Sequence, residues 1–304
     1  MPAWRVVRDL PLPGPADRFD YQSLDTAASR LWIAHMGAGE VLAVDLQPLA
    51  VALRVEGLPR VTGVLAVPPL GRVFASAAGD QAVAELDAAD GRILTRFPAG
   101  RFPDGLAYAP GVHRLFVSDE LGRQELVLDV AGGRALAPIA LGGEAGNSAY
   151  DPVTGRIWVA VQTRDEVVAI DPASDSVLAR VPVPGVEAPH GLMLDPAHRL
   201  AFVAGERNGR VGVLDLETLR MRRTDPVGED PDVLAFDPGR RRLFVASESD
   251  VVAAFAVEGD SLLPLPRYRA AHAHTVAVDP TTHLVYLPLP SVGGRPVLRV
   301  LTAP

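Results

Sequence analysis

Short apolar runs recur along the whole chain and are separated by turn-forming residues. Val233–Phe236 is one such run, and Asp237 and Pro238 mark the turn that follows it. Short runs bounded by Asp, Pro and Gly indicate β-strands. Because the runs are apolar almost throughout, instead of alternating with polar residues, we expect both faces of each strand to be buried.

The strands are organised in repeats. Seven segments align, each beginning 42 or 43 residues after the previous one, and their first residues are Asp20, Thr62, Asp104, Asn147, His190, Asp232 and His274. Every segment is predicted to form four strands, which is typical of a β-propeller blade. The second strand carries one aromatic residue in each copy: Trp32, Phe74, Phe116, Trp158, Phe202, Phe244 and Tyr286. We expect these aromatics to pack between neighbouring sheets.

The two ends of the chain predict how the ring closes. The seventh repeat stops after its third strand, Pro296–Leu301, while residues 4 to 12 resemble the outer strand of another repeat, Val177–Pro184. We therefore expect residues 1–304 to form one domain, an all-β, seven-bladed β-propeller with four antiparallel strands per blade. The N-terminal strand would close the last blade and so remove the seam at which the ring could open.

Composition limits the partners of the protein. The formal net charge is −8 and the longest basic run is Arg240–Arg242, so we expect no nucleic-acid partner. No apolar run approaches the ~20 residues that cross a bilayer, so we expect no membrane contact. Met1–Val7 lacks the layout of a signal peptide. We expect a cytoplasmic monomer or, if a signal peptide was removed, a periplasmic or secreted one.

Polar residues are expected to gather at one mouth of the channel. The first residue of each repeat precedes an apolar strand, so all seven first residues lie at one height and are candidate ligand-binding residues. A second group follows the second strand, which runs back toward the same mouth: His35, Met36, Asp119, Glu120, Gln162, Glu206 and Glu248. The mouth is therefore predicted to be acidic, with imidazoles among the carboxylates.

Three of these positions suggest a metal site. His190, Asp232 and His274 come from consecutive blades, and two imidazoles with one carboxylate form a recognised arrangement for a divalent transition metal such as Mn²⁺ or Zn²⁺. Asp20 is predicted to add an oxygen ligand. The alternative is an all-oxygen Ca²⁺ site on Asp20, Asp104, Asn147 and Asp232. No motif for an organic cofactor is visible, and the absence of cysteine excludes thiolate ligands.

Three functions remain open for this mouth. The first is a propeller that binds a small molecule or a divalent metal there. The second is a metal-dependent lactonase or lyase, for which Glu120, Glu206 and Glu248 are candidate catalytic acids or bases. The third is a protein-interaction scaffold without catalysis. A plain solvated rim, whose polar residues only cap backbone groups, is the simplest alternative to all three.

Two stretches resemble a known family. Asp237–Val245 and Asp151–Val159 follow the form Asp-Pro-x-x-x-Arg, then two large apolar residues and Val, and Arg18–Tyr21 adds to the likeness. On these residues the chain resembles the YncE-like propellers with a YVTN-type repeat, over nearly its whole length. The resemblance implies the propeller fold; members are often exported, and some are associated with DNA binding. Similar propellers include gluconolactonase-type lactonases and virginiamycin B lyase, which are metal-dependent enzymes with the site at one mouth.

Overall fold

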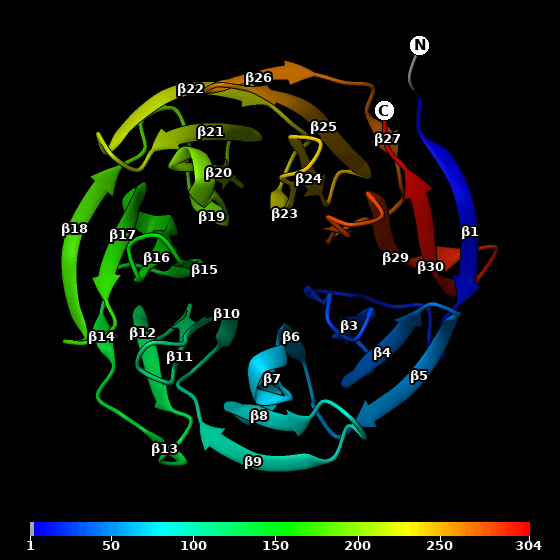
Figure 1. The fold of residues 1–304 in the computed structure, drawn as a ribbon, viewed down its shortest axis with the longest axis horizontal. Coiled ribbons are helices and arrows are strands. Elements are labelled where there is room, and N and C mark those ends of the chain that lie inside the picture. The colour runs from blue at the N-terminus through cyan, green and yellow to red at the C-terminus, as the bar shows by residue number, and fades with distance from the viewer. Residues whose placement is uncertain (1–2) are drawn as a thin grey trace.

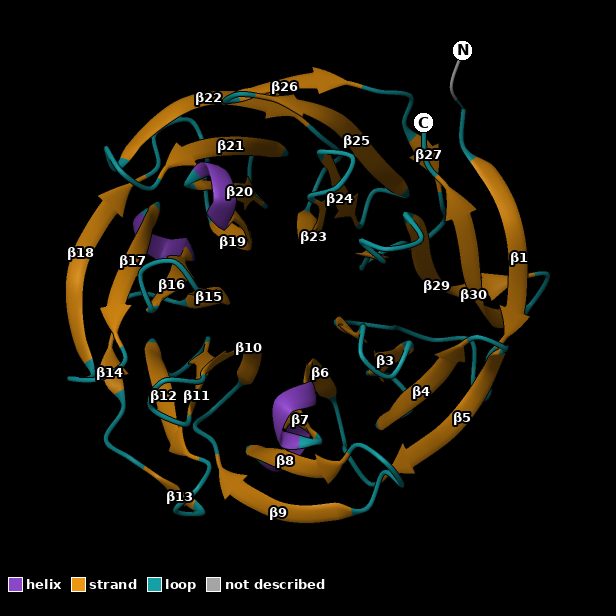
Figure 2. Cartoon of the chain, viewed as in Figure 1, coloured by secondary structure: helices purple, strands orange, loops and turns teal. Residues whose placement is uncertain are grey.

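The computed structural model describes residues 3–304, which form seven antiparallel sheets arranged as a ring around a central channel (Figure 1). Each sheet has a path of four strands, so the predicted seven-bladed propeller is confirmed. Helical structure within residues 3–304 is confined to four short 3₁₀ turns: η1 (Pro68–Leu70), η2 (Ala78–Asp80), η3 (Gln162–Arg164) and η4 (Pro196–His198) (Figure 2). No helix in this range is long and apolar enough to cross a membrane.

Blades 1 to 3 each run from an inner strand at the channel to an outer strand at the rim. Blade 1 contains β2 (Gln22–Asp25), β3 (Arg30–His35), β4 (Glu40–Leu46) and β5 (Leu49–Glu56). Blade 2 contains β6 (Val61–Val67), β7 (Arg72–Ala77), β8 (Ala82–Asp87) and β9 (Ile93–Pro98). Blade 3 contains β10 (Pro103–Ala109), β11 (Arg114–Asp119), β12 (Gln124–Asp129) and β13 (Arg134–Ala135), with β14 (Ile139–Ala140) also beside β12.

Blades 4 to 7 repeat this plan. Blade 4 contains β15 (Ala145–Asp151), β16 (Arg156–Val161), β17 (Glu166–Asp171) and β18 (Ser176–Pro182). Blade 5 contains β19 (Pro189–Asp195), β20 (Leu200–Gly205), β21 (Arg210–Asp215) and β22 (Arg220–Pro226). Blade 6 contains β23 (Pro231–Asp237), β24 (Arg242–Ser247), β25 (Val251–Glu258) and β26 (Ser261–Pro264), with β27 (Tyr268–Arg269) also beside β25. Blade 7 contains β28 (Ala277–Val278), β29 (Leu284–Val292), β30 (Arg295–Thr302) and β1 (Arg5–Pro11).

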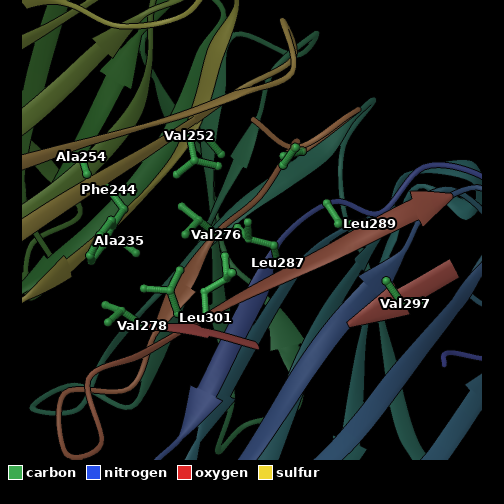
Figure 3. Packing of buried hydrophobic residues seen from close by; sticks show 14 residues of the cluster. Ala235, Phe244, Val252, Ala254, Val276, Val278, Leu287, Leu289, Val297 and Leu301 are labelled. Carbon is green, nitrogen blue, oxygen red and sulfur yellow. The ribbon is translucent and has the colours of Figure 1, made fainter. Parts of the chain in front are cut away.

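The core is divided into seven apolar clusters, one between each pair of neighbouring blades. The aromatic of each second strand is at most 2% exposed and packs in the cluster toward the next blade. Figure 3 shows the cluster between blades 6 and 7, where Phe244 and Val252 lie near Val276 and Leu287. Burial on both faces of every sheet explains the near-continuous apolar strands, and the expected aromatic packing is confirmed.

The N-terminal strand closes the ring, as the sequence predicts. β1 pairs with β30 in antiparallel register, with Asp9 opposite Arg299 (Figure 1). The Arg299 guanidinium lies 2.6 Å from Asp9 Oδ2, and the backbone N–H of Leu12 donates to the carbonyl of Pro296 at 2.9 Å. The first strand in the sequence therefore supplies the outer edge of the last blade.

The far mouth, where the inner strands end, is held by buried ion pairs between blades. In blades 4, 5 and 6 the inner strand ends in an aspartate that is at most 2% exposed. Each aspartate accepts a hydrogen bond from a side chain of the next blade: Asp151 from Arg199 at 2.8 Å, Asp195 from Arg241 at 2.8 Å, and Asp237 from His283 at 2.7 Å. Three successive blade interfaces are therefore joined by a side-chain hydrogen bond to a buried carboxylate.

Candidate functional site

In blades 2 to 6 a β-bulge lies at the first residue of the repeat. The inner strands lose register with their neighbours within Pro189–Leu192, around His190, and within Pro231–Leu234, around Asp232. The other shifts lie between Val61 and Val64, Pro103 and Leu106, and Ala145 and Ser148. A bulged residue leaves the hydrogen-bond ladder and can point in a new direction, which is why bulges occur beside functional sites.

Glycine beside the bulge lets neighbouring inner strands approach closely. A Cβ atom on Gly191 would lie 2.1 Å from the carbonyl oxygen of Asp232, and one on Gly63 would lie 2.1 Å from that of Asp104. These contacts are too short for any side chain, so glycine is required there. The close approach draws polar residues of successive blades into one cluster.

Asp232 lies at the centre of this cluster, between two imidazoles. Its Oδ2 atom is 2.8 Å from His274 Nε2, and its Oδ1 atom is 3.2 Å from His190 Nε2. His274 Nε2 is also 3.1 Å from Asp20 Oδ1, and His190 Nε2 is 3.6 Å from Asp104 Oδ2. All five residues are 4–6% exposed, so five titratable side chains share one buried site.

The cluster divides into two groups of metal-ligand geometry that overlap at Asp232. One consists of Asp20, Asp232 and His274, and the other of His190, Glu206 and Asp232; the ligand atoms within each group lie within 4.8 Å of one another. The expected trio of His190, Asp232 and His274 does not itself form such a group among residues 3–304. The blade of Asp232 stands between those of the two histidines, which keeps the imidazoles apart.

Strong charge coupling links the three central residues. Burial alone would lower the pKa of His274, but Asp232 and the bonded carboxylates raise it to about 12. Burial likewise opposes the charge of His190, but Asp232 foremost raises its pKa to about 10. Burial would raise the pKa of Asp232, yet the two imidazoliums hold it well below its usual range. At neutral pH the metal-free cluster is therefore a carboxylate between two imidazoliums.

The surrounding carboxyls are perturbed in opposite directions. Burial, together with the charge of Asp20, raises the pKa of Asp104 to about 7. Burial also raises the pKa values of Glu120 and Glu206. The pKa of Glu248 is lowered instead, chiefly because it accepts a hydrogen bond from His274. Glu120 and Glu206 are therefore the candidate acids or bases that hold a proton more readily than usual.

Two ring residues stand outside the cluster. Thr62 donates a hydrogen bond to the carbonyl of Pro103 at 2.8 Å, which links two blades. Asn147 lines the channel cavity below and is not part of the lining of the mouth pocket. Of the oxygen set of the calcium alternative, Asp20, Asp104 and Asp232 therefore line the mouth pocket and Asn147 does not.

Two residues of the second group also point elsewhere, which corrects the expectation that this whole group faces the mouth. His35 is fully buried, 3.0 Å from Glu40 and 2.7 Å from Asp17, and stacks on Phe19. Asp119 accepts hydrogen bonds from backbone N–H groups, among them that of Phe102 at 2.8 Å. Both residues fix loops, and the acidic character of the mouth comes from the remaining carboxylates.

The mouth holds a pocket of about 240 Å³ that includes residues the sequence did not single out as site residues. Arg18 lies 3.1 Å from Glu248 and 2.9 Å from His274 Nε2. The Tyr21 hydroxyl donates to Asp104 Oδ2 at 3.2 Å, and Tyr21 also lines the channel cavity beneath. Tyr21 thus forms the floor between the two spaces. The signal for both residues was their position beside Asp20 in the Arg18–Tyr21 run.

The side chains present suit a divalent cation. The atoms around Asp232 are 2.8–3.2 Å apart, which is the spacing expected between neighbouring ligands of an ion bound at about 2.0–2.2 Å. Asp232 Oδ1 lacks a partner of hydrogen-bond geometry within the described chain, whereas His274 Nδ1 lies 3.0 Å from Glu248. Asp20, Asp232 and His274 would hold an ion on one side of the cluster, and His190, Glu206 and Asp232 would hold one on the other.

The fold defines this chain as a seven-bladed β-propeller, with a buried polar cluster at one mouth. No family model and no curated protein matches the sequence. Solved structures do match. Hydrazine synthase of Kuenenia stuttgartiensis has a TM-score of 0.79 and 15% identity, covering 95% of this chain and 96% of that one. A streptogramin B lyase has a TM-score of 0.81 and 13% identity, covering 99% and 98%, and the WD40 repeats of RRP9 have a TM-score of 0.82 and 12% identity, covering 100% and 99%. At such identities the likeness shows the fold alone. The resemblance to YncE-like propellers stays a prediction.

Proposed function

We propose that this protein binds a divalent transition metal at the channel mouth and uses it to hold a small polar ligand. The observation that carries the proposal is the placement of Asp232 between His274 and His190, at 2.8 and 3.2 Å. A buried carboxylate that meets two imidazoles offers mixed nitrogen and oxygen donors, which favour Mn²⁺ or Zn²⁺. Ca²⁺ prefers oxygen donors alone and is the weaker candidate.

The pocket suits a ligand with an anionic or carbonyl oxygen. Arg60 lines it, with its guanidinium 4.8 Å from the ring centre of Phe102, and no carboxylate among residues 3–304 lies within ion-pair distance of that guanidinium. Arg60 is therefore free to bind an oxygen of a ligand that enters the mouth. A volume of about 240 Å³ fits a small molecule.

Metal analysis of the purified protein and thermal melting with added Mn²⁺ or Zn²⁺ test this function. We expect a bound metal and a melting temperature that rises with metal concentration, since an ion that binds only the folded state stabilises it. Asp232→Asn should abolish the rise, whereas Asp260→Asn, in the exposed turn after β25, should preserve it. Equal melting curves with and without metal in the wild type would contradict the proposal.

A second candidate is a metal-dependent lyase or lactonase that uses the same pocket. It is favoured by Glu120 and Glu206, which line the pocket and have raised pKa values, because proton transfer needs such a group. A bound metal would supply polarisation of a substrate carbonyl. One protein of similar fold is a streptogramin B lyase.

The enzymatic candidate is tested with a panel of lactones and esters in the presence of Mn²⁺ or Zn²⁺. We expect activity in the wild type, a strong loss in His274→Ala, and a loss with retained metal binding in Glu120→Gln. An inactive wild type, or activity that survives His274→Ala, would exclude this site as catalytic for those substrates and leave metal-dependent binding as the function.

A further inference from the structure

We propose that the mouth holds two divalent ions and that Asp232 bridges them, an inference that rests on the proposed metal-binding function. One ion would bind to Asp20, Asp232 and His274, and the other to His190, Glu206 and Asp232. Asp232 is the residue common to both groups. Each of its oxygens faces a different imidazole, with Oδ2 toward His274 and Oδ1 toward His190.

A single ion does not account for both histidines. Two ligands on opposite sides of one ion are separated by at most about 4–5 Å when each bond is 2.0–2.4 Å long. The two groups each meet a limit of 4.8 Å, but His190, His274 and Asp232 together do not. A carboxylate that bridges with its two oxygens instead places two ions about 3.5–4 Å apart, the separation found in two-metal sites.

A buried oxygen without a hydrogen-bond partner supports the second ion. Asp232 is 6% exposed, and no donor within residues 3–304 meets its Oδ1 atom in hydrogen-bond geometry, although His190 Nε2 lies 3.2 Å away. A buried polar atom in this state is costly, and it is rare in folded proteins. An ion bound between Oδ1 and His190 would satisfy it.

The charge of the pocket also calls for more than one divalent ion. Its lining has six carboxylates: Asp20, Asp104, Glu120, Glu206, Asp232 and Glu248. The guanidiniums of Arg18 and Arg60 supply two positive charges in the same lining. When all six carboxyls are ionised and both imidazoles are neutral, one divalent ion leaves two negative charges in excess and two ions balance the site. Charge that is withdrawn from water is tolerated when it is paired.

Mn²⁺ binding, followed by equilibrium dialysis and electron paramagnetic resonance, tests the bridge. We expect the wild type to bind two Mn²⁺ per chain, with the six-line signal of isolated Mn²⁺ broadened by coupling between the ions. His190→Gln should bind one ion and recover the six-line signal. His113→Gln is the matched control, because His113 is an exposed histidine at the far mouth, and it should behave as the wild type.

The possible results separate this inference from the function on which it rests. No bound Mn²⁺ or Zn²⁺ would overturn both. One ion per chain in the wild type, or two ions with uncoupled signals, would overturn the bridge and retain the metal-binding function. If His190→Gln does not fold by circular dichroism, Glu206→Gln replaces it, since Glu206 is a less buried ligand of the same ion.

Discussion

The two mouths of the propeller both bury carboxylates but treat them differently. At the far mouth, Asp237 ends β23 and meets one side chain of the next blade, His283 at 2.7 Å, while a backbone N–H of its own turn donates to its other oxygen. At the near mouth, Asp232 near the start of the same strand lies between two imidazoles and keeps one oxygen without a hydrogen bond. Asp237 and Asp232 are similarly buried, and they differ in the side chains that pair with them.

This difference separates a structural role from a binding role. A buried carboxylate whose two oxygens both accept hydrogen bonds joins neighbouring blades and needs no added ligand. A buried cluster with shared partners and surplus negative charge is balanced only when something positive is added. We therefore expect mutations at the far mouth to act on stability, and mutations at the near mouth to act on metal binding.

The largest expected effect is a fall in stability when an ion pair of the far mouth is removed. Arg199→Met leaves Asp151, which is fully buried, without its cation from the next blade, and such a loss typically costs about 3 kcal/mol. The free energy of unfolding, measured by urea denaturation, should fall by that order. Arg96→Met, at a half-exposed pair on the rim, should change it little. Equal losses in the two variants would remove the distinction between the mouths.

The affinity of the near mouth for metal should depend on pH. The pKa values of His274 and His190 are raised to about 12 and about 10, so both are protonated in the metal-free protein at neutral pH. A metal must displace each proton, so apparent affinity should rise about tenfold per pH unit for each imidazole bound. Calorimetric titration with Mn²⁺ between pH 6 and 8, in buffers of different ionisation enthalpy, measures the change and the protons released. An affinity independent of pH would exclude the imidazoles as ligands.

A smaller effect is expected at Asp104, where a substitution should raise stability and not lower it. Its pKa of about 7 lies above the value of about 3.9 in an unfolded chain, so its protonated form favours folding below pH 4. That contribution is lost as the pH rises from 4 to 7, and the ionised carboxylate then destabilises the fold. Asp104→Asn, with chelator present, should raise the melting temperature by a few degrees at pH 8 and have little effect at pH 4.5. A lower melting temperature at pH 8 would show that Asp104 is already well paired.

We expect no binding of nucleic acid. A net charge of −8 and the carboxylates of the mouth should repel phosphates at physiological salt. A mobility-shift titration with duplex and single-stranded DNA should therefore show no complex. A salt-sensitive complex at micromolar protein concentration would contradict this prediction and would place a basic binding surface away from both mouths.

The repeat made the fold predictable in detail. Its period gave the number of blades, the aromatic of each second strand gave the packing between them, and the incomplete seventh copy gave the pairing of β1 with β30. Each of these features depends on the order of residues along the chain, which an alignment of repeats records directly. The height of Asp232, His190 and His274 at one mouth followed from the same alignment.

The direction of part of the second group was mispredicted, because that group merged two repeat positions. His35 and Asp119 are the last residues of β3 and β11 and bind loops, whereas the lining of the mouth pocket comes from the next position: Met36, Glu120, Glu206 and Glu248. Successive residues of an extended chain point in opposite directions, so an alignment that kept the two positions apart would have separated them. The split of the cluster into two groups depends on bulges and close strand contacts, for which glycines such as Gly191 were the unused signal.

The pairing of β1 with β30 also sets the order in which the molecule can be built. In a growing chain β1 emerges before the blades and β30 after them, so β1 stays unpaired while the blades between them are synthesised. Asp20 and His274, whose contact spans 254 positions, meet across the same junction. The polar cluster therefore cannot be complete until the last blade has been synthesised, and a chain truncated before that blade would lack His274 and part of the site.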